Sequence, residues 1–115
     1  MSGDSIAKAK SMAFAQRMVR LYQYLTNEKR EFILSKQLLR SGTSIGANIT
    51  EAIYGSSKRD FAAKLRIALK ECAETLYWLE LLYTTGYLEQ EAYQSLFQDC
   101  DALRRILSSA VKNAE

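Results

Sequence analysis

The sequence predicts an all-α fold, an up-down-up-down antiparallel four-helix bundle, from three observations. The 115 residues include no proline and only five glycines, the two residue types that helix interiors tolerate least. Apolar residues recur every three or four positions in four segments, at about residues 4–25, 30–54, 57–84 and 89–112. The connections between the segments are short, and short connections make neighbouring helices antiparallel. The length is that of a single domain, residues 1–115.

The first segment carries one apolar stripe, formed by Phe14, Met18, Leu21 and Leu25. The second contains the stretch SGTSIGANITEA, residues 41–52, which is rich in poor helix formers. At 100° per residue, the apolar positions of this segment stay within roughly 40° of one line. These positions are Leu34, Leu38, Ile45, Ile49 and Ala52. The stretch is therefore predicted to be part of one continuous helix, with Gly55 as a left-handed C-terminal cap.

Ser57 and Asp60 have the spacing of a capping box and predict the start of the third helix. Its apolar face comprises Phe61, Leu65, Ala68, Cys72, Leu79 and Leu82, and Gly86 ends it. The fourth segment has Ala92, Leu96, Cys100, Leu103, Leu107 and Ala110 in register. Cys72 and Cys100 should lie at similar heights on adjacent helices. A disulfide could join them, but a reducing cytoplasm favours buried free thiols.

The absence of histidine and the presence of only two cysteines argue against standard zinc sites and against most nucleophilic catalysis. We therefore expect a non-enzymatic protein with no metal, no cofactor and no small-molecule substrate. The alternative is an enzyme built on Glu51, Glu74 and Lys64. No apolar run approaches the ~18 residues of a membrane span. Because the N-terminus also lacks the apolar core of a signal peptide, a cytoplasmic location is expected.

Four polar residues flank the apolar seam of the second helix at spacings of three, four and three: Ser41, Ser44, Asn48 and Glu51. One interpretation is a functional polar site. The preferred interpretation is a buried hydrogen-bond network that fixes helix register, because polar groups at a seam must find partners. Lys64, Arg66 or a tyrosine hydroxyl could supply those partners.

Gly42 and Gly46 lie one turn apart on the other flank of the same helix. Two interior glycines destabilise a helix by about 1 kcal/mol each relative to alanine, so a packing role is expected. Either another helix approaches unusually closely here, as at small-xxx-small pairs, or the glycines accept a bulky side chain such as Trp78.

The net charge of +3 is unevenly distributed: residues 71–101 contain seven acidic residues and no lysine or arginine. In an up-down bundle, the starts of the first and third helices and the end of the fourth share one end. That arrangement collects Lys8, Lys10, Lys58, Arg59, Lys64, Arg66, Arg104, Arg105 and Lys112. Such an end could bind RNA or DNA phosphates in a salt-dependent way, or carry ordinary solvated charge that orients subunits. No aromatic cluster interleaves with these residues in the sequence, so sequence-specific recognition is not expected.

Apolar and aromatic residues of the third helix also lie off its main seam, and these are Ile67, Tyr77, Trp78 and Leu81. One small bundle cannot readily bury every such residue, and aromatic surface is typical of protein interfaces. We therefore predict a homo-oligomer with these residues in the interface.

The motif residues resemble those of a known family. Gln37-Leu38 is followed by Ser44, Ile45, Asn48, Ile49 and Glu51, then by Ser57, Lys58 and Phe61, and then by Ala68, Glu74, Leu76 and Leu79. Over residues 35–88 this pattern resembles the four-helix-bundle proteins encoded in intervening sequences of bacterial 23S rRNA genes. Gly46 stands where many members carry proline, and Ala52 where many carry glycine.

The resemblance implies a bundle that assembles into a ring, typically a pentamer, and it supplies no catalytic residues. One branch is similar to the accessory protein of diversity-generating retroelements, which binds a reverse transcriptase and nucleic acid. The expected function is thus a non-enzymatic, oligomeric structural or interaction module. The alternative is an accessory protein that binds nucleic acid through the basic end, with a reverse transcriptase as partner.

Overall fold

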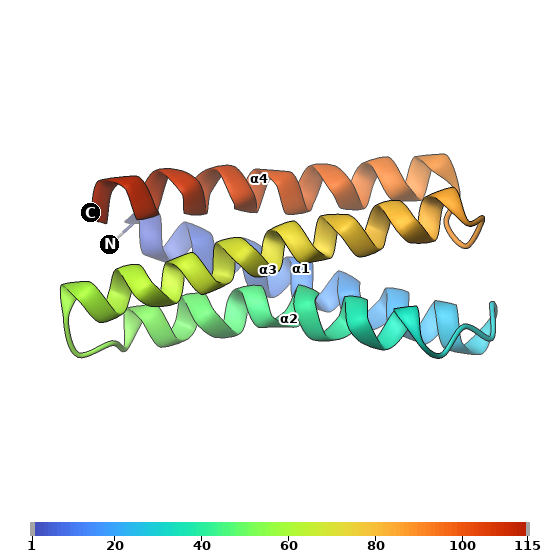
Figure 1. Cartoon of the computed structure of the whole chain (residues 1–115), viewed down its shortest axis with the longest axis horizontal. Helices are drawn as coiled ribbons and strands as arrows, with labels where there is room; N and C mark the ends of the chain where they lie inside the picture. Colours follow the sequence, from blue (N-terminus) through green and yellow to red (C-terminus); the bar gives the residue numbers. More distant parts are fainter. Residues whose placement is uncertain (1, 115) are drawn as a thin grey trace.

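Four helices alternate in direction along the chain in a computed structural model that describes residues 2–114 (Figure 1). They are α1 (Ser2–Asn27), α2 (Leu34–Ile53), α3 (Lys58–Thr84) and α4 (Gln90–Ala114). Each helix packs on the next, and α4 returns to α1 through a smaller contact, so that α1 lies diagonally opposite α3. The bundle measures 44 × 20 × 19 Å. Residues 2–114 contain no strand, in agreement with the predicted all-α bundle.

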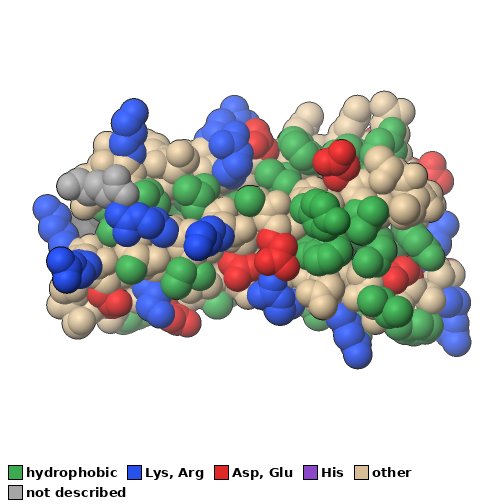
Figure 2. All heavy atoms as spheres, in the orientation of Figure 1, with side chains coloured by type: hydrophobic (Ala, Val, Ile, Leu, Met, Phe, Trp, Pro, Cys, Tyr) green, Lys and Arg blue, Asp and Glu red, His purple; other side chains and the backbone are tan. Residues whose placement is uncertain are grey.

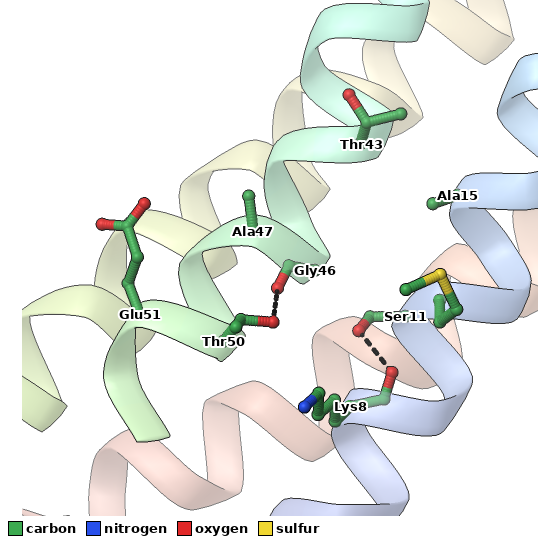
Figure 3. A pocket seen from close by; sticks show the side chains of 9 residues that line it. Lys8, Ser11, Ala15, Thr43, Gly46, Ala47, Thr50 and Glu51 are labelled. Carbon is green, nitrogen blue, oxygen red and sulfur yellow. Dashed lines mark hydrogen bonds between the residues drawn. The ribbon is translucent and has the colours of Figure 1, made fainter. Parts of the chain in front are cut away.

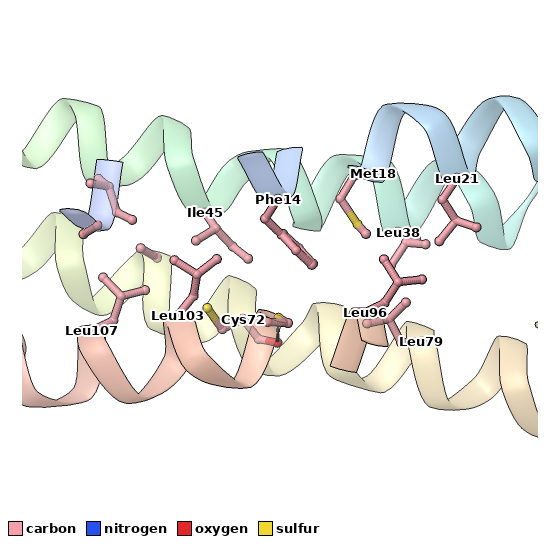
Figure 4. Close-up of a cluster of buried hydrophobic side chains, with 14 of the residues drawn as sticks. Phe14, Met18, Leu21, Leu38, Ile45, Cys72, Leu79, Leu96, Leu103 and Leu107 are labelled. Atoms are coloured by element: carbon pink, nitrogen blue, oxygen red, sulfur yellow. Dashed lines mark hydrogen bonds between the residues drawn. The ribbon is translucent and has the colours of Figure 1, made fainter. Parts of the chain in front are cut away.

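The core runs along the bundle axis and is formed by the predicted apolar stripes (Figure 4). Its largest fully enclosed side chains include Phe14, Met18, Ile45, Leu79, Leu103 and Leu107. Leu34, Phe61 and Ala110 are only partly buried at the edge of the core. Ala92, predicted to lie on the inner face of α4, is exposed, while Leu88 in the preceding connection is buried. The core is thus closed at this end by Leu88.

Helix α2 begins at Leu34 rather than at the predicted residue 30, with Ile33 at the N-cap position and the Glu31 side chain folded over the first turn. The Glu31 carboxylate accepts hydrogen bonds from the backbone N–H groups of Ile33, Leu34 and Ser35 at 3.2, 3.0 and 2.7 Å. These donors have no partner inside the helix. Arg30, just before it, has a φ of 57°, a left-handed conformation that breaks the helical path.

Glu31 has a lowered pKa although it is buried. Burial alone raises the pKa of this carboxyl group, but the hydrogen bonds from three backbone N–H groups and from the Ser35 hydroxyl outweigh that effect. The positive end of the α2 dipole favours the charged form as well. The carboxylate therefore stabilises the start of α2 in its ionised state.

Two glycines flank α3, and they have different structural roles. Ser57 caps α3 as expected, because its hydroxyl accepts the Asp60 N–H at 3.0 Å. Gly86 follows α3 with a φ of 90°, a conformation that glycine adopts without strain. Gly55 does not have a positive φ, so the predicted left-handed cap is wrong. The space at Gly55 is tight, because a Cβ would lie 3.1 Å from the Ala52 carbonyl oxygen and would displace the Asp60 carboxylate, whose Oδ2 would be 2.6 Å away.

The stretch 41–52 lies wholly within α2, so the prediction of one continuous helix is confirmed. Its glycines face α1 rather than Trp78. A Cβ on Gly42 would lie 2.5 Å from both Cγ and Sδ of Met18, and one on Gly46 would lie 3.0 Å from the Ser11 hydroxyl. Met18 is fully buried, so it has little room to move away. The absence of a side chain at Gly42 lets α1 pack closely on α2.

Replacing Gly42 by alanine should lower the free energy of unfolding by about 1–2 kcal/mol, because overpacking against Met18 outweighs the gain in helix propensity. In a Met18→Ala background the same change should become stabilising by about 0.5–1 kcal/mol. Urea unfolding of the four proteins measures this coupling. Gln37→Gly compared with Gln37→Ala, at an exposed position of α2, reports helix propensity alone. Equal effects of Gly42→Ala in both backgrounds would contradict the close contact.

Replacing Glu31 by glutamine should destabilise the protein by about 1 kcal/mol at pH 7, because an amide cannot accept all these bonds. The folded-state pKa of Glu31 lies below its ordinary value of 4.5. Its stabilising effect is therefore present above that value and is lost as the pH falls through the lowered one. Urea unfolding at several pH values should show the two proteins converging in acid. A difference that stays constant down to pH ~2 would show that the carboxylate charge is unimportant.

Candidate functional site

The polar stripe of α2 does not form the single buried network that its spacing suggests. Only Ser41 is fully buried, and its hydroxyl oxygen accepts a 2.9 Å hydrogen bond from the hydroxyl of Thr75 on α3. Ser44 donates to the Arg40 carbonyl at 2.6 Å, and Asn48 donates to the Ser44 carbonyl at 2.8 Å. These two side chains therefore bond to their own helix. The Ser41–Thr75 hydrogen bond and the exposed Glu51–Lys64 ion pair are the links from the stripe to α3.

The three residues of the enzyme hypothesis lie in two separate ion-pair clusters. Glu51 is exposed and pairs with Lys64 at 2.9 Å, and this contact raises the pKa of Lys64. Glu74 instead accepts from Arg40 at 2.5 Å and from the Trp78 indole N–H at 3.1 Å. The hydrogen bond from Arg40, followed by that from Trp78, lowers the pKa of Glu74. Each carboxylate pairs with a different cation, and the two do not converge on one cleft.

The predicted interface residues form an aromatic surface on α3. Tyr77 is 59% exposed and meets Trp78 edge to face, with 5.0 Å between ring centroids. Ile67 is 40% exposed, and Leu81 is partly buried and lines a shallow hollow beside Tyr77. Figure 2 shows hydrophobic side chains gathered over the half of α3 that leads to α4. Because Glu74 fixes the Trp78 indole, this surface presents a rigid ring next to an exposed one.

A groove between α1 and α2 exists because the residues that face it are small (Figure 3). It has a volume of about 370 Å³ and is lined by Lys8, Ser11, Met12, Ala15, Thr43, Gly46, Ala47, Thr50 and Glu51. The hydroxyls of Ser11 and Thr50 bond to backbone carbonyls of their own helices, at 2.9 and 2.8 Å. The groove therefore offers mainly apolar surface, with the 57% exposed Met12 on its lining. Such a groove suits an apolar side chain of a partner.

The predicted basic residues differ in how far they are neutralised. Lys64 pairs with Glu51, and Arg104 and Arg105 both pair with Asp101, at 2.7 and 3.4 Å. Arg66 is exposed on α3. Five others are exposed and make no ion pair with any side chain of residues 6–114: Lys8, Lys10, Lys58, Arg59 and Lys112.

Helix topology brings these five cations to one end of the bundle. The start of α1, the start of α3 and the end of α4 meet there, together with the connection from α2 to α3 (Figure 1). Figure 2 shows lysine and arginine side chains around this end. We call it the basic end, defined by Lys8, Lys10, Lys58, Arg59 and Lys112. It can attract anions, because these five cations are exposed and make no ion pair with a side chain that the structure describes.

Sequence reasoning missed Tyr54, which lies at the basic end. This residue follows the last turn of α2, and its side chain is 77% exposed. The ammonium group of Lys8 lies 5.9 Å from the centre of its ring, within the range of a cation–π contact. In the sequence, the sign of this residue was a tyrosine that follows the apolar seam of α2 and precedes a glycine. Only the packing of α1 against α2 shows that a lysine stands beside it.

Cys72 and Cys100 are buried free thiols on α3 and α4. The Cys100 thiol donates to the Cys72 carbonyl over 3.7 Å. Hydrogen bonding with Cys72 and burial both raise the pKa of Cys100, so it stays protonated and unreactive near neutral pH.

Between residues 2 and 114, no helix is long and apolar enough to cross a bilayer. Among the side chains that the structure describes, no group of three is suited to a metal.

The comparisons with known proteins identify the family. Residues 3–109 match the family described as 23S rRNA-intervening sequence protein. The chain belongs to this family. The match covers most of α1 and α4, the helices whose sequences carry no specific motif, as well as the central stretch. No curated protein matches the chain.

A solved relative of the family has nearly the same fold. It is a protein of unknown function from the S23 ribosomal protein family of Bacteroides thetaiotaomicron VPI-5482, with a crystal structure at 1.70 Å resolution. It shares 53% sequence identity and superposes with a TM-score of 0.94, covering 96% of this chain and 98% of the relative. The family and the fold of the chain are thus established. The surfaces described above are the basis for its proposed function.

Proposed function

We propose that this protein is a non-enzymatic structural or interaction module that works as a homo-oligomer in the cytoplasm. The observation that carries the proposal is the aromatic surface of α3, where Tyr77 is 59% exposed beside the fixed Trp78. Exposed aromatic rings next to partly buried apolar residues are typical of the centre of an interface. The buried free thiols suit a reducing compartment.

A closed ring is the assembly that best uses these surfaces. A ring requires two different patches on each subunit, because each contact joins unlike surfaces. This chain has two candidates, the aromatic surface on α3 and the apolar groove between α1 and α2. They lie on different helices, which favours an unlike contact over a twofold one. The number of subunits, five, rests on the family resemblance.

Replacing Tyr77 by glutamate should dissociate the assembly, because a charge would be buried in the interface. The wild-type mass in solution should be about five times 13.1 kDa, and that of the variant should approach one subunit. Light scattering at micromolar concentration measures both. Tyr24→Glu is the matched control, since Tyr24 is 41% exposed on α1 outside both surfaces. A monomeric wild-type protein with native helicity would refute the proposal.

A second candidate function is nucleic-acid binding through the basic end, and five exposed cations that make no ion pair with a described side chain favour it. A ring with its axis near-parallel to the helices would bring this end of every subunit to one face. Such a face would attract the phosphates of RNA or DNA and release counterions on binding. A reverse transcriptase partner is supported only by the resemblance to retroelement accessory proteins.

Reversing the charge of Lys58 and Arg59 to glutamate should weaken binding of single-stranded RNA. Loss of two phosphate contacts should reduce the slope of log K against log salt by about 1.4 per subunit in contact. Filter binding at several salt concentrations measures the slope. Lys29→Glu with Lys36→Glu makes the same charge change at the opposite end of the bundle and should have a smaller effect. Binding that does not depend on salt would exclude this function.

A further inference from the structure

Tyr54 is an exposed aromatic ring on a fixed piece of backbone. Its side chain is 77% exposed, whereas its N–H donates to the Thr50 carbonyl at 3.2 Å and holds the residue against the end of α2. A tyrosine loses little side-chain entropy on binding, because only two torsion angles must be fixed. The apolar face of such a ring is available to a flat partner.

Tyr54 lies near several cations and near one carboxylate, that of Asp60, which approaches Gly55. The Lys8 ammonium group lies 5.9 Å from the ring centre, and Lys58 and Arg59 follow at the start of α3. Both of these are exposed and make no ion pair with a described residue. A ligand that satisfies this arrangement carries negative charge and a flat π-system a short distance apart. Nucleotides in a single strand have this combination, since each base is separated from its phosphates by one sugar.

Other occupants fit less well. Duplex nucleic acid offers phosphates, but its bases are stacked on each other and cannot lie on a tyrosine. A free phosphate would use the cations and leave the ring unused. A second copy of this chain would bring its own basic end against these cations, and like charges repel. The ring and the cations together therefore favour an unpaired strand.

We propose that Tyr54 stacks on an unpaired base while Lys8, Lys58 and Arg59 hold the adjacent phosphates. The basic end then binds single-stranded RNA or DNA in preference to duplex. This inference rests on the nucleic-acid function proposed above and adds its ligand class and its aromatic contact. Stacking on tyrosine tolerates any base, so the preference is for single strands rather than for one sequence.

The test compares variants of the full-length protein by fluorescence anisotropy with labelled strands. Single-stranded RNA and DNA of about 16 nucleotides, and a duplex of the same sequence, serve as probes. Tyr54→Ala should weaken binding of both single strands about tenfold or more, and leave duplex binding unchanged. Tyr54→Phe should bind like the wild type, because it keeps the ring. Tyr24→Ala removes an exposed ring near the opposite end of the bundle, outside both proposed interface surfaces, and should not affect strand binding.

The possible outcomes distinguish the stacking inference from the nucleic-acid function of the basic end. If Tyr54→Ala binds single strands as tightly as the wild type while Lys58→Glu with Arg59→Glu does not, the stacking inference is wrong and the function of the basic end stands. An equal loss for single strands and duplex also overturns the stacking inference. If the wild-type protein binds no probe at low salt, the nucleic-acid function and the inference both fail. Light scattering and circular dichroism on each variant establish that assembly and helicity are intact.

Discussion

The packing of α1 on α2 at Gly42 is the contact on which the rest of the bundle depends. Helix α1 is joined in sequence only to α2, and its contact with α4 is much smaller. A Cβ at Gly42 would lie 2.5 Å from Met18, so this approach is possible only without a side chain there. The low helix propensity of α2 is therefore offset by its close packing on α1. The polar residues nearby hydrogen-bond mostly to the backbone of α2 itself.

The same contact builds two of the surfaces to which we assign functions. Because α1 and α2 lie so close at Gly46, small residues on both helices line a groove of about 370 Å³. The register of the two helices also brings Lys8 next to Tyr54, on different helices at the basic end. The aromatic surface of α3 is independent of α1, since Trp78 is fixed by Glu74 and thereby linked to Arg40 on α2. The proposed assembly thus uses both the α1–α2 groove and the surface of α3, whereas the Lys8–Tyr54 arrangement depends on the α1–α2 contact.

Periodic apolar positions were sufficient to predict the four helices, because each stripe faces one continuous core. Contacts between side chain and backbone in the connections could not be predicted. Glu31 is not at the N-cap position of α2, so the sequence gives no sign that its carboxylate covers the first turn. The candidate basic residues could also be located from their residue type and from the end of the helix that carries them. Which of them pair with a carboxylate depends on side-chain rotamers and on the register of the helices. Lys64 and Arg105 resemble Lys58 in the sequence, yet nearby carboxylates neutralise them.

Native-state hydrogen exchange of α2 tests most directly whether the stretch 41–52 is a packing element. Ile45 and Ile49 are fully or almost fully buried within this glycine-containing segment. If packing holds it in place, their amide hydrogens should exchange only through global unfolding, with the free energy that urea unfolding gives. Exchange of these amides through local opening, as fast as at the end of α4, would show that the stretch is a mobile segment rather than the element that holds α1 in place.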